Sequence, residues 1–149
     1  MAYKLFPFHN LDASVGKGAI NRADDVRLVQ ALIEICIGAS RGLEDVRRKC
    51  KELGGPEPGK KLAVNGVYSD DLAAYIEMIQ RHLKKAGKSV TVDGKVTPVP
   101  VSRGFDLNTR TRAGGDYTLL MLNRTAVETD SEAFLELGRK IGVNFGIPM

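Results

Sequence analysis

Two short turn signals on either side of one amphipathic segment constrain the fold of this chain more than any other feature. Asn65-Gly66 and Asp93-Gly94 lie 28 positions apart in the sequence of 149 residues, and valines flank both pairs. Asn or Asp followed by glycine readily adopts the backbone of a tight turn. Residues 69–87, between the pairs, carry apolar side chains at spacings of three and four, as a half-buried helix does. The sequence therefore predicts a turn, a helix and a second turn, with short extended pieces and a weak internal repeat.

Similar patterns predict helices on the N-terminal side of this unit. Residues 21–37 carry an apolar stripe, with Asn21 as the expected N-cap. Residues 40–53 carry a second stripe and predict another helix, which a loop rich in glycine and proline follows. Ser69 is the expected N-cap of the central helix, and Gly87 is its expected stop.

The C-terminal side begins with a long loop and continues as two helices. Residues 98–115 contain prolines and glycines but no helical stripe, which indicates an exposed loop. A short helix is expected over residues 116–123. Thr129 and Glu132 form a capping-box pattern that opens a last helix, and the apolar tail, residues 143–149, is expected to pack back on the body. The fold class is therefore mainly α.

Size and composition favour one globular domain over residues 1–149. The hydrophobic share of 43% and the charged share of 27% are ordinary for a globular protein, and a chain of this length buries enough surface for one core. No stretch approaches the ~18 apolar residues of a membrane span. The first ten residues lack the apolar region of a secretory signal, so the chain is expected to be cytoplasmic as synthesised.

The sequence offers no catalytic or metal-binding pattern, and we expect a protein that is not an enzyme and has no cofactor. No dinucleotide, Walker, HExxH or GxSxG motif is present. His9 and His82 are far apart in sequence and have no ligand-type neighbours. Cys36 and Cys50 lie on apolar stripes, and two interpretations remain open for them: reduced core thiols, or a disulfide formed in an oxidising compartment.

Taken in order, these elements resemble the peptidoglycan-binding-like domain, a small helical module with Asp-Gly turns before and after its central helix. The resemblance covers residues 15–123. The positions that match its opening, middle and closing signatures are Val15, Gly16, Gly18, Asn21, Asp25, Val26, Val29, Gln30 and Leu32; then Asn65, Gly66, Tyr68, Ser69, Ile79 and Gln80; then Asp93, Gly94, Val96, Gly115, Thr118, Leu119, Leu122 and Asn123. The resemblance implies a peptidoglycan-binding-like helical bundle with short extended turns.

The chain departs from the family pattern in three places. Residues 38–62 insert a helix and a loop before the first turn, and residues 98–114 separate the last turn from the closing signature. Asn65 replaces the usual first Asp. Residues 124–149 add a C-terminal helix and tail. The fold implied by the resemblance is therefore a core with two insertions and one extension.

Charge and the resemblance together select the candidate binding residues. The net charge of the whole chain is +4, whereas residues 81–112 alone carry +6. Such a stretch attracts acidic polymers, and an arginine can hold a carboxylate with two hydrogen bonds. An exposed tyrosine can stack on a sugar ring. The candidate ligand-binding residues are Tyr68, Arg81, Arg103, Arg110 and Arg112.

A structural interpretation remains open for each candidate. The basic side chains of the central helix can simply keep its outer face in water, and Tyr68 can instead fill the core between helices. The asparagine, aspartate and glycines of the two turns are expected to serve the backbone geometry.

The resemblance implies non-catalytic binding of peptidoglycan or its peptide stems. No metal or cofactor is expected because the sequence has no ligand-type cluster or motif. No nucleic-acid partner is expected because the charge bias is modest and aromatic residues do not alternate with the basic ones. Proteins resembling this one can belong to type VI secretion or to phage lysis systems, so export to the periplasm by a specialised route is part of this expectation. The alternative is a protein-interaction module, such as an adaptor, an immunity protein or a structural component of a secretion system. A wall hydrolase is a third interpretation, and it would need a cluster of carboxylates. The densest acidic group of this sequence, in residues 128–136, is better explained by the start of a helix, where acidic side chains are favoured.

Overall fold

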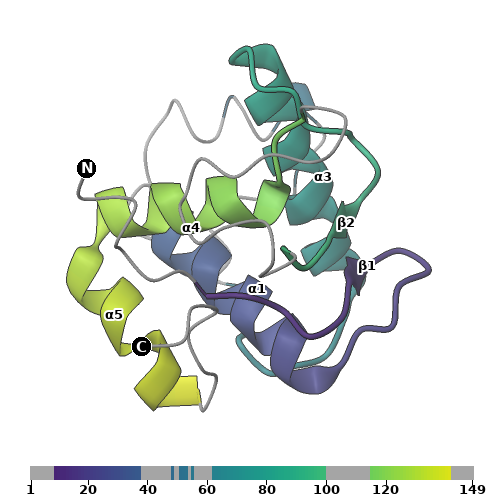
Figure 1. Cartoon of the computed structure of the whole chain (residues 1–149). Coiled ribbons are helices and arrows are strands. Elements are labelled where there is room, and N and C mark those ends of the chain that lie inside the picture. Colours follow the sequence, from purple (N-terminus) through teal and green to yellow (C-terminus); the bar gives the residue numbers. More distant parts are fainter. Residues whose placement is uncertain are drawn as a thin grey trace.

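The computed structural model of the chain is mainly helical (Figure 1), and it describes residues 9–37, 48, 51–53, 55, 62–99 and 115–141. Side chains are described as far as residue 137. The elements in chain order are β1 (Val15–Gly16), α1 (Ala23–Ile37), α3 (Asp70–Lys85), β2 (Lys95–Val96), α4 (Thr118–Thr129) and α5 (Ser131–Ile141). Most of the helix expected over 40–53, positions 100–114 of the long loop and the tail 143–149 lie outside the described residues.

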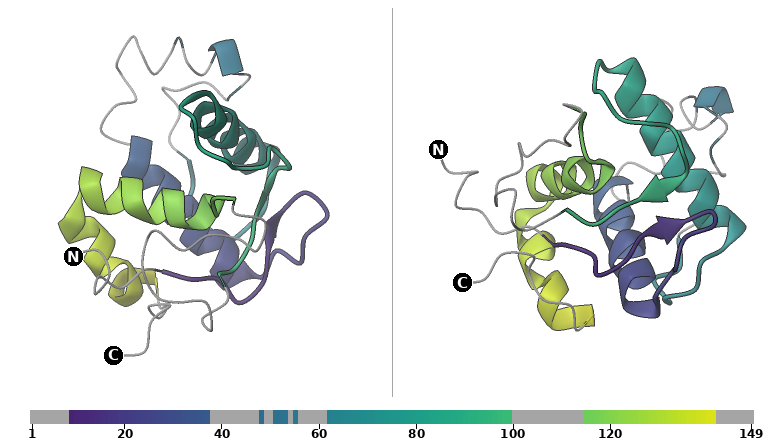
Figure 2. Two further views of the ribbon diagram at one scale, coloured as in Figure 1. Left: turned by 45° about the horizontal axis from the view of Figure 1, so that its top comes forward. Right: turned by 45° about the vertical axis from the view of Figure 1, so that its right-hand side comes forward.

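Three helices, α1, α4 and α5, pack against one another and enclose the centre of the core. Figure 1 shows α4 lying across α1 with α5 following at its end, and the turned views in Figure 2 show the same arrangement. Val26, Leu32, Leu119, Leu122 and Phe134 are buried where these helices meet. α3 packs beside β2. Within the part of the chain that the structure describes, no helix is both long and apolar enough to cross a membrane.

A two-stranded antiparallel sheet joins the start of the described chain to the second turn. Val15 pairs with Val96 and Gly16 with Lys95. Gly16 has a φ of 142°, and a Cβ at this position would lie 2.8 Å from the Cα of Lys95. Only glycine therefore allows β1 to approach β2 this closely.

The start of α1 differs from the sequence expectation. Asn21 is not the N-cap: its φ is 55°, and its side chain turns back to accept a hydrogen bond from the Gly16 N–H (2.8 Å) and to donate to the Gly16 and Ala19 carbonyls. Asparagine tolerates this left-handed backbone because its side chain can bond locally. Asn21 therefore closes the loop between β1 and α1, and α1 begins at Ala23.

The central helix begins and ends where the sequence predicts. The Ser69 hydroxyl accepts the Leu72 N–H at 3.3 Å, which confirms Ser69 as the N-cap of α3. At the other end Gly87 has a φ of 92°. Its N–H bonds the Lys84 carbonyl and the following N–H bonds the Leu83 carbonyl, a Schellman-type termination.

Two expectations about the last helices were wrong. The helix expected to end at Asn123 runs to Thr129. The Asn123 side chain bonds the Leu119 carbonyl and the His9 backbone and so does not end the helix, and Ala126 and Val127 of the added turns are buried in the core. The expected cap, Thr129, is the last residue of α4. Asp130 caps α5 instead, since its Oδ1 accepts the Ala133 N–H at 3.0 Å.

His9 is a fully buried histidine that ties the start of the described chain to α4 and α5. Its N–H donates to Asn123 Oδ1 (2.7 Å) and its Nε2 donates to the Phe134 carbonyl (2.7 Å). The two rings of His9 and Phe134 meet edge to face, with centroids 4.7 Å apart. Burial lowers the pKa of His9, and the Phe134 carbonyl offsets part of this effect. The imidazole is therefore a neutral core side chain.

Acid is expected to weaken the fold through His9. The unfolded chain protonates His9 more readily than the folded chain does. The contribution of His9 to the free energy of unfolding is therefore constant above pH ~6.5 and decreases below it, by at most about 1.4 kcal/mol per pH unit. Urea unfolding between pH 7.5 and 5 measures this slope. A His9→Gln variant should be less stable at neutral pH and should lose the slope, and a slope unchanged in that variant would assign the effect to other groups.

Candidate functional site

The first turn is held by a buried glutamine from α1. Gln30 Oε1 accepts the N–H groups of Asn65 (3.0 Å) and Gly66 (2.9 Å). Its Nε2 donates to Asn65 Oδ1 and to the Val67 carbonyl, both at 3.1 Å. One amide side chain thus satisfies both donors and acceptors of the turn.

The second turn is held in the same way by Gln80 of α3. Gln80 Oε1 accepts the Gly94 N–H at 2.9 Å, and its Nε2 donates to Asp93 Oδ1 (3.1 Å) and the Lys95 carbonyl (2.9 Å). Nε2 also lies 3.2 Å from the Thr118 hydroxyl at the start of α4. Gln80 is completely buried and Gln30 nearly so. We call each glutamine with its turn a glutamine clamp.

The two turns have the same geometry, as the weak internal repeat predicts. In each turn the Asn65 or Asp93 Oδ1 also accepts the N–H two residues on, at 3.0 Å, and the glycine has a positive φ of 78° or 71°. The turn residues therefore serve the backbone, as expected. Both glutamines stand in apolar-Gln pairs of the sequence, but nothing local in the sequence assigns them this role.

The candidate residues Tyr68 and Arg81 do not form one site. Tyr68 is half-buried and packs against the core at the N-terminal end of α3. Burial raises its pKa, with a further contribution from the charges of Glu77 and Asp70. Arg81 lies near the other end of this helix of about 24 Å.

Arg81 already has protein partners. Its Nη1 donates to the Leu53 carbonyl at 2.7 Å, and its Nη2 pairs with Glu77 at 3.3 Å. These bonds hold residues 51–53 against α3, so Arg81 stabilises the fold. Arg103, Arg110 and Arg112 lie outside the described residues.

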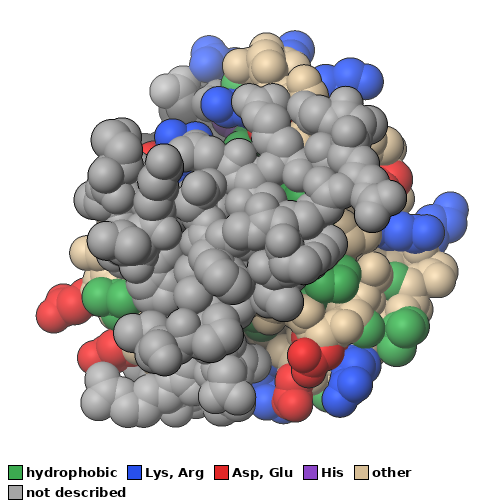
Figure 3. Space-filling model, viewed as in Figure 1, with side chains coloured by type: hydrophobic (Ala, Val, Ile, Leu, Met, Phe, Trp, Pro, Cys, Tyr) green, Lys and Arg blue, Asp and Glu red, His purple; other side chains and the backbone are tan. Residues whose placement is uncertain are grey.

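The described part of the basic stretch gathers at the C-terminal end of α3. Lys84, Lys85 and Lys88 are exposed there, and Figure 3 shows blue side chains over this end of the molecule. Lys95 is exposed on β2. The clustering of lysines beyond Arg81 therefore gives this end of α3 a positive surface.

A cavity of about 270 Å³ lies between α1, α3, α4 and residues 51–53. Its lining consists of Cys36, Ile37, Leu53, Met78, Ile79, His82, Leu83, Met121, Leu122 and Thr125. His82 and Thr125 are exposed, whereas Met78, Met121 and Leu122 are buried. The cavity therefore has an apolar interior with polar residues at its opening, which sequence reasoning did not find.

Cys36 is a free thiol in the cavity wall. Its Sγ lies 3.5 Å from the Leu122 carbonyl, and burial raises its pKa to about 12. Its expected partner, Cys50, lies outside the described residues.

Cys36 should react slowly with thiol reagents. A pKa of about 12 instead of 9.0 leaves so little thiolate at pH 8 that alkylation should be about 50-fold slower than for an ordinary cysteine, even allowing for its greater nucleophilicity. Iodoacetamide labelling of a Cys50→Ser variant, with the extent of alkylation measured by mass spectrometry, tests this. The same variant in urea should label at the ordinary rate, and equal rates in both states would contradict the burial of the thiol.

Among the described residues, no three His, Cys, Asp or Glu side chains lie close enough to hold a metal ion. His9 is in the core and His82 is at the cavity opening, on different elements. Comparison of the chain with protein-family models, with curated proteins and with solved structures finds no match in any of the three.

Proposed function

We propose that the chain is a non-catalytic module that binds peptidoglycan or its peptide stems. The observation that supports this most is the pair of glutamine clamps around α3. They give one structural role to the apolar-Gln pairs and Asx-Gly turns on which the resemblance to peptidoglycan-binding-like domains rests.

The proposed contact surface is the positive end of α3. Lys84, Lys85 and Lys88 are exposed on it, and the stem peptides of peptidoglycan carry carboxylates. Lysines on a solvated surface attract such groups through charge, an effect that salt screens only in part at short range. Arg81 is not assigned to the ligand because Leu53 and Glu77 hold it.

Sedimentation with purified sacculi tests this proposal. At ~0.15 M salt, where long-range charge effects are screened, the protein should pellet with sacculi. Lys84→Glu/Lys88→Glu should lower the bound fraction about tenfold, which corresponds to about 1.4 kcal/mol. Lys17→Glu/Arg22→Glu changes two exposed cations in the segment between β1 and α1, outside the positive end of α3, and should leave binding unchanged. No retention of the parent protein, or equal losses in both variants, would reject the proposal.

The second candidate, a protein-interaction module, is favoured by apolar side chains exposed near the start of α1. Ile20 is 75% exposed and Val67 is 60% exposed. Gly66, next to Val67, packs close to the Ala23 backbone, which brings the first turn to this end of α1. If sacculi do not retain the protein and a purified secretion-system component does, an Ile20→Ser/Val67→Ser variant should lose that binding.

A further inference from the structure

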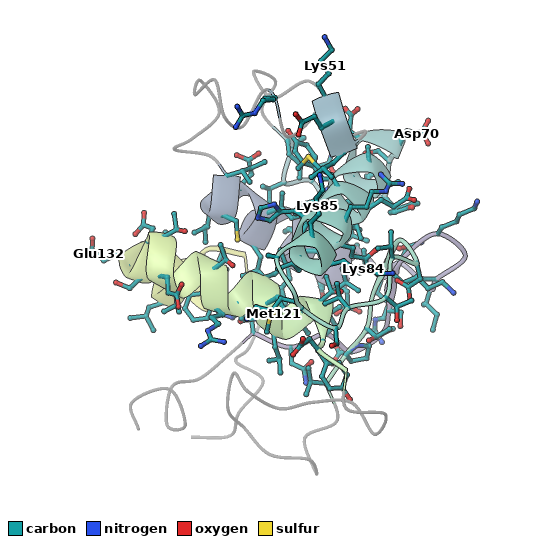
Figure 4. All side chains as sticks on the ribbon, turned by 90° about the horizontal axis from the view of Figure 1, so that it is seen from above. Lys51, Asp70, Lys84, Lys85, Met121 and Glu132 are labelled. Atoms are coloured by element: carbon teal, nitrogen blue, oxygen red, sulfur yellow. The ribbon has the colours of Figure 1, made fainter. Side chains whose placement is uncertain are left out.

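We propose that the cavity between α1, α3 and α4 binds a small amphipathic anion, with the apolar chain inside and the acidic group at the opening. This site borders the proposed wall-binding surface and shares Lys85 with it, but the cavity interior is not part of that surface. Figure 4 shows the region from above, with Lys85 of α3 and Met121 of α4 labelled on the helices that border it.

The interior suits an apolar chain. Eight of the ten lining residues have apolar or thiol side chains, and two of them, Met78 and Met121, are methionines. Methionine is flexible and polarisable, so a wall built with it adapts to ligands of different shape. A volume of about 270 Å³ accommodates roughly nine non-hydrogen atoms at the ~30 Å³ that a water molecule occupies in the liquid. This is close to the size of octanoate.

The opening suits an anionic group. Thr125 supplies a hydroxyl and His82 an imidazole, and both residues are exposed at the rim. Lys85 follows His82 by three positions on α3, so helix geometry places it on the same side. In the chain, Glu52 precedes the lining residue Leu53, and Glu128 follows the lining residue Thr125 by three positions. Glu128 is paired with Arg124 at 3.7 Å on α4, whereas Lys84 and Lys85 are exposed on α3 beside the lining residues His82 and Leu83.

Octanoate, octylamine and octanol are suitable probes because they share a chain and differ in the head group. Methyl signals of Met78 and Met121, read by NMR, should shift saturably with octanoate, with a Kd on the order of 0.1–1 mM for a ligand of this size. Octanol should bind several-fold more weakly and octylamine more weakly still. No saturable shift with octanoate, or binding of octylamine as tight as that of octanoate, would overturn the proposal.

Two variants locate the ligand, each with a matched control. Thr125→Trp should block the opening and weaken octanoate binding at least tenfold, whereas Thr129→Trp, one turn further along α4 and also exposed, should not. Lys85→Glu should weaken octanoate binding about fivefold and remove the preference over octylamine, whereas Lys95→Glu should do neither. If Thr125→Trp does not fold, Ile79→Phe fills the same cavity from α3. Unchanged binding in both the folded cavity-filling variant and Lys85→Glu would overturn the site.

Discussion

Gln80→Glu is expected to lower the free energy of unfolding by about 4 kcal/mol, roughly twice the loss from Gln30→Glu. Both changes replace the amide donor of a buried side chain by an oxygen. At Gln80 that oxygen would face the Asp93 carboxylate, whereas at Gln30 it would face the neutral Asn65 amide. Asp93 is exposed, but its carboxylate lies 3.1 Å from the buried Gln80 amide nitrogen. Two like charges at this distance repel more strongly than a charge and a dipole, so the two clamps respond unequally to the same substitution.

Urea unfolding of the two single variants at pH 7.5 measures the difference. Asp93→Asn gives a further check, because Asn65 already performs the same role in the first turn. Alone it should cost less than about 1 kcal/mol, and combined with Gln80→Glu it should recover about half of the loss. If both glutamates are equally destabilising, the charge of Asp93 does not bear on the second clamp.

Asn123→Ala is expected to cost about 3 kcal/mol, and Asn10→Ala about 1 kcal/mol. The two asparagines make similar bonds: Asn123 pairs with the N–H and C=O of His9, and Asn10 with those of Val99. Asn123 is completely buried, whereas Asn10 is half-buried. In Asn10→Ala, water can replace the lost side-chain amide. In Asn123→Ala it cannot, so the backbone N–H and C=O of His9 remain unsatisfied.

Chemical denaturation followed by far-UV circular dichroism compares these variants. Asn123→Ala should also shorten the protection of the His9 amide in hydrogen exchange, because that N–H loses its acceptor. Asn10→Ala should leave the His9 amide protected. Equal losses of stability at the two positions would mean that burial of Asn123 contributes little.

Local signals in the sequence predicted local structure well. The Ser69 cap, the Gly87 termination and the Asx-Gly geometry of both turns involve residues within a few positions of each other, and all are present. The prediction of Asn21 as an N-cap was wrong because its side chain bonds Gly16, five positions back. The prediction that α4 ends at Asn123 was also wrong, and the sequence could not show that this side chain bonds His9, 114 positions away.

The candidate site was harder to predict because its residues meet only in three dimensions. The charge of Arg81 suggested a ligand, but its partners come from positions 53 and 77. The cavity combines three helices that no sequence pattern links. The family resemblance stays a prediction, and the experiment with sacculi tests the binding that it implies.

The clamps also imply an order of folding. Gln80 closes a loop of 14 residues to Gly94, whereas Gln30 must close one of 36 residues to Gly66. The longer closure costs about 0.8 kcal/mol more in chain entropy, since that cost rises with the logarithm of loop length. The α3–β2 unit should therefore assemble first and provide the edge on which β1 then pairs, so that the C-terminal half of the repeat nucleates the N-terminal half.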